Sequence, residues 1–79
     1  MGVKILFFGA TAKVTGARQI EHSFDEMCTS GQLFDQLIEK YPDLARHKLL
    51  FSVNRQYATG EEVIHDGDEL AIFTAVSGG

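Results

Sequence analysis

The sequence predicts an α+β fold in which one amphipathic helix covers one face of a mixed sheet of four to five strands. Short runs rich in β-branched and aromatic residues, with side chains that alternate between two faces, recur along the chain. Only one stretch has a long helical pattern, and a single helix can cover only one face of a sheet. With 79 residues the chain has room for one core, so we treat residues 1–79 as one domain with 74–79 as an extended tail.

The predicted strands are short and separated by turn signals. The first is "VKILFFG", followed by a small, polar segment, residues 10–16, that we expect to form one helical turn or a loop. Further strands are expected at 17–24, at 49–55, within 61–65 and at 69–73. The pair Asp66-Gly67 favours a tight turn and predicts a hairpin between the last two of these strands.

The single long helix is predicted to begin after Thr29 and to end near Tyr41. Thr29 and Gln32 have the spacing of a capping box, in which each side chain accepts a hydrogen bond from the other residue's backbone N–H. An apolar stripe follows at helical spacing: Leu33, Phe34, Leu37, Ile38 and Tyr41. Pro42 ends the helix, because it disfavours helical geometry in the residue before it and has no N–H to donate.

This order of strands around one helix suits a β-grasp fold, with the first and last strands side by side in the middle of the sheet. Alternation along these two strands assigns their side chains to faces. One set is expected to face the helix: Val3, Ile5, Phe7, Leu70 and Ile72. The other set is expected on the open face: Leu6, Phe8, Ala71 and Phe73. Exposed aromatics on an open sheet face predict a partner interface. The alternative is that a loop at residues 57–62 folds across and covers them.

Composition and charge exclude several classes of function. Eleven acidic residues against seven Lys and Arg give a net charge of −4, and without a basic cluster we expect no nucleic-acid partner. No stretch approaches the roughly 18 apolar residues of a membrane helix, and the start of the chain lacks a signal-peptide pattern. A single cysteine cannot form an internal disulfide, which fits a reducing compartment. We therefore expect a cytoplasmic protein with no membrane partner.

The residues that could bind a metal or act as a nucleophile are given structural roles. Cys28 is expected to be a small buried residue, because no flanking base is evident. The three histidines, His22, His47 and His65, have no metal-ligand spacing. The acidic cluster Asp66, Asp68 and Glu69 is explained by the turn that it surrounds. No metal or bound cofactor is expected. Lys13 and Arg55 are either solvated surface charges or rim charges that select a partner.

The last segment, "FTAVSGG", ends on Gly78 and Gly79, which add no side chain to a core and lose the most backbone entropy on ordering. The six residues after Phe73 reach about 20 Å when extended. We expect the chain to dock by its open face and to push residues 75–79 into the active site of a partner, where Val76 and Ser77 contact it. Glycine leaves a narrow channel unobstructed, so the α-carboxylate of Gly79 is the reactive group that this arm delivers.

Three features resemble the small subunits of molybdopterin synthase, a family of ubiquitin-like β-grasp sulfur carriers. They are "KILFFG" near the start, "GDELAIFTAVSGG" at the end, and the single capped helix. The resemblance implies that an ATP-dependent adenylating enzyme of the ubiquitin-activating type converts the Gly79 carboxylate to an acyl-adenylate, and that sulfur then gives a thiocarboxylate. It also implies a heterotetramer in which this tail enters the large subunit. There the sulfur passes to a cyclic pyranopterin and builds the dithiolene of molybdopterin.

The resemblance also implies roles for residues of this chain. Gly79 bears the sulfur, Gly78 gives the slim approach, and Phe8 and Phe73 fall where the family has partner-facing aromatics. Catalytic side chains belong mainly to the large subunit. The family commonly has a proline pair where this chain has Thr74-Ala75, which predicts a more flexible exit of the tail from the sheet.

Three alternatives remain open at the level of the sequence. The sulfur carrier of the thiamine pathway shares the fold, the Gly-Gly end and the adenylation step. A ubiquitin-like modifier would instead have Gly79 joined to lysines of target proteins. A plain interaction domain would carry the glycines only as a flexible end or an expression remnant.

Overall fold

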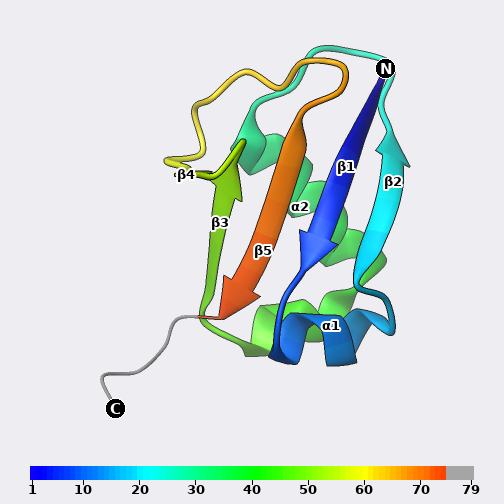
Figure 1. Ribbon diagram of the computed structural model, residues 1–79, viewed down its shortest axis with the longest axis vertical. Helices are drawn as coiled ribbons and strands as arrows, with labels where there is room; N and C mark the ends of the chain where they lie inside the picture. The colour runs from blue at the N-terminus through cyan, green and yellow to red at the C-terminus, as the bar shows by residue number, and fades with distance from the viewer. Residues whose placement is uncertain (75–79) are drawn as a thin grey trace.

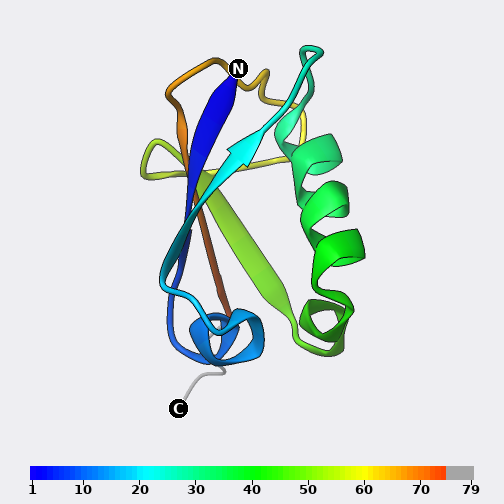
Figure 2. The same ribbon diagram turned by 90° about the vertical axis from the view of Figure 1, so that its right-hand side faces the viewer.

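A mixed sheet and one long helix make up the two layers of the molecule in a computed structural model that describes residues 1–74. Figure 1 looks onto the sheet, and Figure 2 shows the two layers edge-on, with α1 at the lower end of the sheet. The elements, in chain order, are β1 (Gly2–Phe7), α1 (Ala10–Thr15), β2 (Gln19–Ser23), α2 (Ser30–Lys40), the 3₁₀ helix η1 (Pro42–Arg46), β3 (Leu49–Val53), β4 (Gln56–Tyr57) and β5 (Glu69–Thr74).

Strands β1 and β5 lie side by side in the middle of the sheet, as the sequence predicts. Among residues 1–74 the strand order is β2-β1-β5-β3-β4. β1 and β5 are parallel, with Ile5 opposite Leu70 and Phe7 opposite Ile72. β2 runs antiparallel to β1, and β3 runs antiparallel to β5. The predicted sheet of four to five strands is confirmed, and its two central strands come from opposite ends of the described chain.

The start and end of α2 confirm the capping prediction. The Thr29 hydroxyl accepts a hydrogen bond from the Gln32 N–H at 3.2 Å, and the Gln32 side chain accepts one from the Thr29 N–H at 2.9 Å. The helix ends at its C-cap Tyr41, and Pro42 then starts η1, which the sequence pattern did not predict. The segment at residues 10–16, expected as a helical turn or a loop, forms the six-residue helix α1.

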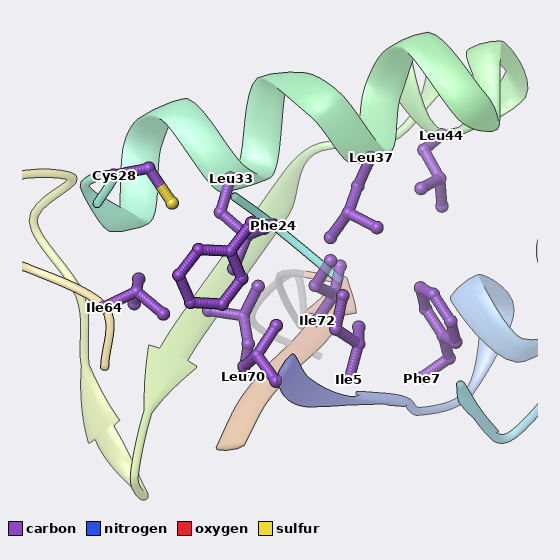
Figure 3. Packing of buried hydrophobic residues seen from close by; sticks show 11 residues of the cluster. Ile5, Phe7, Phe24, Cys28, Leu33, Leu37, Leu44, Ile64, Leu70 and Ile72 are labelled. Carbon is purple, nitrogen blue, oxygen red and sulfur yellow. The ribbon is translucent and has the colours of Figure 1, made fainter. Parts of the chain in front are cut away.

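The core lies between α2 and one face of the sheet (Figure 3). The five residues of β1 and β5 predicted to face the helix are each at most 2% exposed. The Phe7 ring meets the Tyr41 ring edge-on, with centroids 5.9 Å apart, which ties the end of β1 to the end of α2. The buried hydrophobic residues are Val3, Ile5, Phe7, Phe24, Cys28, Leu33, Leu37, Leu44, Ile64, Leu70 and Ile72.

The prediction of a short strand within residues 61–65 is wrong. That segment makes only an isolated bridge from Val63 to Thr29, and the short strand of the fold is β4. β4 forms because Asn54 and Arg55 both have positive φ, of 49° and 72°, and this geometry lets β3 turn back on itself through two residues. The predicted hairpin at Asp66-Gly67 is also wrong, although the two residues do form a turn. With no strand before it, this turn leads directly into β5.

Residues 59–62 are attached to the N-terminus of α2 instead of pairing with the sheet. The Glu62 carboxylate accepts hydrogen bonds from the Ser30 hydroxyl at 2.6 Å and from the Thr59 N–H at 2.8 Å. These hydrogen bonds lower the pKa of Glu62 to about 2, and the bond from Ser30 has the largest effect. The Gly31 N–H donates to the Gly60 carbonyl at 3.0 Å, and a Cβ on Gly31 would lie 3.0 Å from that same oxygen. A side chain at position 31 would force the two backbones a few tenths of an ångström apart, so their close approach favours glycine there.

Candidate functional site

The face of the sheet opposite α2 presents a strip of apolar side chains. Leu6, Ala71, Ser52 and Tyr57 lie opposite one another in register across β1, β5, β3 and β4, and Leu50 lies opposite Phe73. We call this surface the open face and define it by Leu6, Phe8, Leu50, Tyr57, Ala71 and Phe73. Its most exposed large residues are Tyr57 at 76%, Phe8 at 52% and Leu50 at 40%.

The two ends of this sheet surface differ in polarity. At the start of β1, Lys4 lies opposite Glu21 on one side and Glu69 on the other, so that end is charged. At the other end, Phe8 follows β1, and Phe73 lies next to the last residue of β5, Thr74. Figure 1 shows that β1 and β5 both run toward the end of the sheet where α1 lies. The apolar end of the open face is therefore the end at which the described chain leaves the sheet.

A loop at residues 57–62 was the alternative expected to cover the aromatic side chains of the open face, and of these residues only Tyr57 contacts one of them. The Tyr57 ring lies 6.0 Å from the Phe73 ring, centroid to centroid, and Phe73 is half-buried. Residues 59–62 bond instead to the N-terminus of α2, on the other side of the sheet. Phe8 stays exposed. The apolar strip is thus available to a partner, while its role as an interface stays a prediction.

Thr11 fixes the position of Phe8, and sequence analysis did not single it out. Its side chain is fully buried, and its hydroxyl accepts a hydrogen bond from the Phe8 N–H at 2.9 Å. The same hydroxyl lies 2.7 Å from the Phe8 carbonyl and 2.9 Å from the Ile72 carbonyl, and it donates its one proton to either. One threonine therefore joins α1, the residue after β1 and the central strand β5.

Two hollows border the open face, and each contains a guanidinium-bearing residue. A hollow of about 420 Å³ beside β1 includes Leu6, Phe8 and Arg18 in its lining. A smaller one of about 230 Å³ is lined by Ser52, Arg55, Tyr57 and Phe73. Within residues 1–74 the one ion pair joins Arg46 and Asp43, so no described carboxylate lies within 4.0 Å of the nitrogens of Arg18 or Arg55.

Of the two residues proposed from sequence as rim charges, Arg55 borders the apolar strip directly. Lys13 is exposed and lines a neighbouring hollow behind Gly9 that also includes Arg18. Arg18 was missed, because nothing in the sequence shows that the start of β2 lies beside Phe8. That proximity follows from the pairing of Leu6 with Gln19.

The other polar and sulfur-bearing candidates have structural roles. Cys28 is 8% exposed, which confirms the prediction that it is buried, and burial raises the pKa of its thiol. Although partial burial raises the pKa of Asp68, hydrogen bonds from the Asn54 side chain and the His65 N–H lower it by more. Asp66 accepts a hydrogen bond from the Gly2 N–H at 2.7 Å. The acidic cluster therefore holds the turn before β5.

Two classes of feature are not found in the part of the chain that the structure describes. Across residues 1–74, no three His, Cys, Asp or Glu side chains come close enough together to bind a metal ion. Nor does any helix there have the length and apolar character needed to cross a membrane. The predicted tail contacts Val76 and Ser77 and the predicted reactive glycines Gly78 and Gly79 lie outside the described residues.

Comparison with known proteins gives the family. A model of the ThiS family matches residues 5–79. The chain belongs to the ThiS family. A human molybdopterin synthase sulfur carrier subunit is 32% identical to it, covering 98% of this chain and 93% of the human protein. The subunit of the same name from Mycobacterium tuberculosis is 36% identical, over 98% and 96% of the two chains.

Solved structures agree with the family assignment. The crystal structure of the small archaeal modifier protein 1 of Haloferax volcanii has a TM-score of 0.83 at 27% identity, over 95% of this ThiS-family chain and 98% of the modifier. These findings confirm the resemblance drawn from the sequence and the ubiquitin-like β-grasp fold.

Proposed function

We propose that this chain is the sulfur carrier subunit of a molybdopterin synthase. The observation that carries the proposal is the match, over nearly the full length of both chains, with proteins of that name from human and from Mycobacterium tuberculosis. The family match also includes the final Gly-Gly pair, since it extends to residue 79. The geometry of residues 1–74 supports it, because the apolar end of the open face lies where β5 leads into residues 75–79.

The proposed chemistry takes place at the α-carboxylate of Gly79. A carboxylate is a poor acyl donor, so an adenylating enzyme of the ubiquitin-activating type first joins it to AMP, with ATP as the source and pyrophosphate as the leaving group. A reduced sulfur donor then attacks the acyl carbon and displaces AMP, which leaves a thiocarboxylate. ATP binds to the activating enzyme, and the proposed reaction requires no metal or cofactor held by this chain.

In this proposal the large subunit of the synthase supplies the catalytic side chains. The open face docks on that subunit, with Phe8 and Phe73 as apolar anchors and Leu6 between them and the polar end of the sheet. Residues 75–79 enter the active site, where Val76 and Ser77 line the contact and Gly78 leaves room for the backbone. The thiocarboxylate sulfur bonds to a carbon of the cyclic pyranopterin, and water then cleaves the acyl–sulfur bond, so that the sulfur stays on the pterin and the tail returns to a carboxylate.

A protein-modifier function is the second candidate, and the small archaeal modifier protein 1 supports it through its fold and its 27% identity. Adenylation of Gly79 is common to both functions, so the two differ in what attacks the activated carbon. In a modifier the nucleophile is a lysine amine, and the product is an amide. A sulfur carrier of the thiamine pathway is a third possibility, and it would use another acceptor.

The decisive experiment is intact mass measurement after incubation with the adenylating enzyme, ATP and a sulfur donor. We expect a mass increase equal to the replacement of one oxygen by sulfur, and none without ATP. A variant lacking Gly79 should show no increase and should keep the fold, since the described strands, helices and core are all built from residues 1–74. An unchanged mass of the intact chain, or an increase retained in the variant, would refute sulfur loading at Gly79. Lysine-linked adducts in place of the sulfur product would favour the modifier.

A further inference from the structure

We propose that the hollow at Arg55 is a recognition site for a carboxylate side chain of the protein that docks on the open face, and that Arg55 determines partner specificity there. The proposal adds to the proposed function a residue outside the apolar strip and the chemistry of the group that it contacts. It uses the proposed function only to name the large subunit as the partner in one of its two tests.

The geometry places a cation at the edge of an aromatic surface. Ser52, Arg55, Tyr57 and Phe73 line the hollow, and the Tyr57 and Phe73 rings lie 6.0 Å apart at a tilt of 57°. Phe73 and Tyr57 belong both to this hollow and to the open face. A partner that covers these two rings therefore also covers the hollow that contains Arg55.

The charge of Arg55 is not balanced within the described residues. No carboxylate of residues 1–74 lies within 4.0 Å of its guanidinium nitrogens. The nearby acid of this turn region, Asp68, accepts hydrogen bonds from Asn54 and from the His65 N–H instead. Arg55 is exposed, and an exposed guanidinium in the free protein is solvated by water. Docking removes that water, and an unpaired charge covered by a partner costs binding free energy unless an anion compensates it.

The backbone gives a second, independent indication. Arg55 has a φ of 72°, in the left-handed region where glycine is favoured and where a long side chain carries a conformational cost. Asn54, with a φ of 49°, is of a residue type that tolerates this region; arginine is not. An arginine at the second position of this two-residue loop therefore makes the fold less stable than a glycine at the same position would. A side-chain function at that position explains the residue type.

Guanidinium chemistry selects the class of ligand. The planar fork of an arginine donates two parallel hydrogen bonds to a carboxylate, and the neighbouring Tyr57 and Phe73 rings suit apolar atoms next to that group. An Asp or Glu side chain that projects from an otherwise apolar partner surface has both properties. We therefore assign the hollow to an acidic side chain on the partner protein.

The first test measures the affinity of the full-length chain for the large subunit of the synthase by calorimetry. Arg55→Glu should raise Kd by about tenfold or more, because two like charges then face each other. Arg46→Glu is the matched control, since it changes the charge equally at an exposed arginine that is paired with Asp43 on η1. Its Kd should stay within about twofold of the original. Equal effects of the two variants, or none at Arg55, would overturn the assignment.

Arg55→Gly separates recognition from folding in the same assay. Glycine adopts a positive φ without the steric cost that arginine has there, so the melting temperature of this variant should rise by about 2–5 °C. Its Kd for the large subunit should nevertheless increase by about fivefold or more, because the partner's carboxylate loses its cation. A variant that is more stable and binds equally well would show that Arg55 has no recognition role.

The second test does not depend on the proposed function. In an NMR titration of the isotopically labelled chain, phenylacetate should shift the Arg55 Nε–H and Ser52 amide signals, while the neutral phenylacetamide should not. The Arg46 Nε–H signal serves as the internal reference. Similar shifts with both compounds, or similar shifts at Arg46 and Arg55, would refute a carboxylate site. If the chain fails to bind the large subunit, the proposed function fails, and this titration alone decides the inference.

Discussion

At the scale of single residues, Thr11 joins the core to the open face. Its buried hydroxyl accepts a hydrogen bond from the Phe8 N–H and donates one to the carbonyl of Phe8 or of Ile72. Replacement by valine keeps the shape and removes two hydrogen bonds, the one that the hydroxyl accepts and the one that it donates, each of which contributes about 0.5–1.5 kcal/mol. The Phe8 N–H keeps its bond to the Ile72 carbonyl, and the Thr11 N–H keeps its bond to the Phe8 carbonyl, each at 3.2 Å. The residue therefore connects the stability of the fold to the placement of an exposed aromatic side chain.

We predict that Thr11→Val lowers the free energy of unfolding by about 1–3 kcal/mol, measured by urea denaturation. Thr11→Ser, which keeps the hydroxyl and loses a methyl group, should cost about 1 kcal/mol. The order of the two variants is the informative result. If the valine variant is the more stable one, the hydrogen bonds of Thr11 contribute less than its methyl group, and the role given to the hydroxyl is wrong.

At the scale of elements, the attachment of residues 59–62 to α2 depends on an ionised carboxylate. The pKa of Glu62 is lowered to about 2 by the hydrogen bonds from Ser30 and Thr59. A carboxyl group whose pKa is lower in the folded than in the unfolded chain stabilises the fold above the unfolded pKa. That contribution is lost as the pH falls from the unfolded value, about 4.5, through the folded value, about 2.

We predict that Glu62→Gln is less stable than the original chain near neutral pH, and that the difference becomes smaller as the pH falls toward about 2. Urea denaturation at a series of pH values measures it. The neighbouring Glu61→Gln makes the same change in charge at an exposed side chain and should alter the free energy of unfolding less at neutral pH. A stability difference for Glu62→Gln that is constant across this range would contradict the ionic contribution of Glu62.

The elements also show which parts of the fold are encoded locally. Helix α2 was predictable because Thr29, Gln32 and Pro42 mark its ends within the helix's own sequence. The faces of β1 and β5 followed from alternation alone. β4 was missed because its loop has arginine in a position where glycine is the usual signal. The pattern of residues 61–65, which include Ile64, resembles that of a short strand. In the structure Ile64 is a buried core residue, and backbone hydrogen bonds between its loop and the start of α2 hold it in place.

The candidate site was predictable to the same degree. Phe8 and Phe73 were placed on the open face by counting residues along two strands. Arg18 and Thr11 were not, because the position of one depends on the pairing of β2 with β1 and that of the other on hydrogen bonds to a distant strand. Contacts between residues far apart in sequence have no local signal in a single chain.

At the scale of the whole molecule, the sheet has a charged end and an apolar end, and the chain leaves the sheet at the apolar one. Under the proposed function, a partner that docks on the apolar end meets the chain where β5 leads into residues 75–79, so we expect the parallel pairing of β1 and β5 to couple docking to delivery of the tail. Phe8 is the most exposed phenylalanine of the open face, at 52%, and lies outside the core. Its loss should therefore affect binding far more than folding.

We predict that Phe8→Ser raises Kd for the large subunit by about tenfold or more, as expected for an aromatic anchor, with the free energy of unfolding changed by less than about 1 kcal/mol. Met27→Ser is the control, because Met27 is 64% exposed and precedes α2, away from the open face. Its Kd should stay within about twofold of the original. Calorimetric titration of both variants, with urea denaturation beside it, makes the comparison. If Met27→Ser weakens binding as much as Phe8→Ser, docking does not occur through the open face, and the coupling between docking and tail delivery is lost with it.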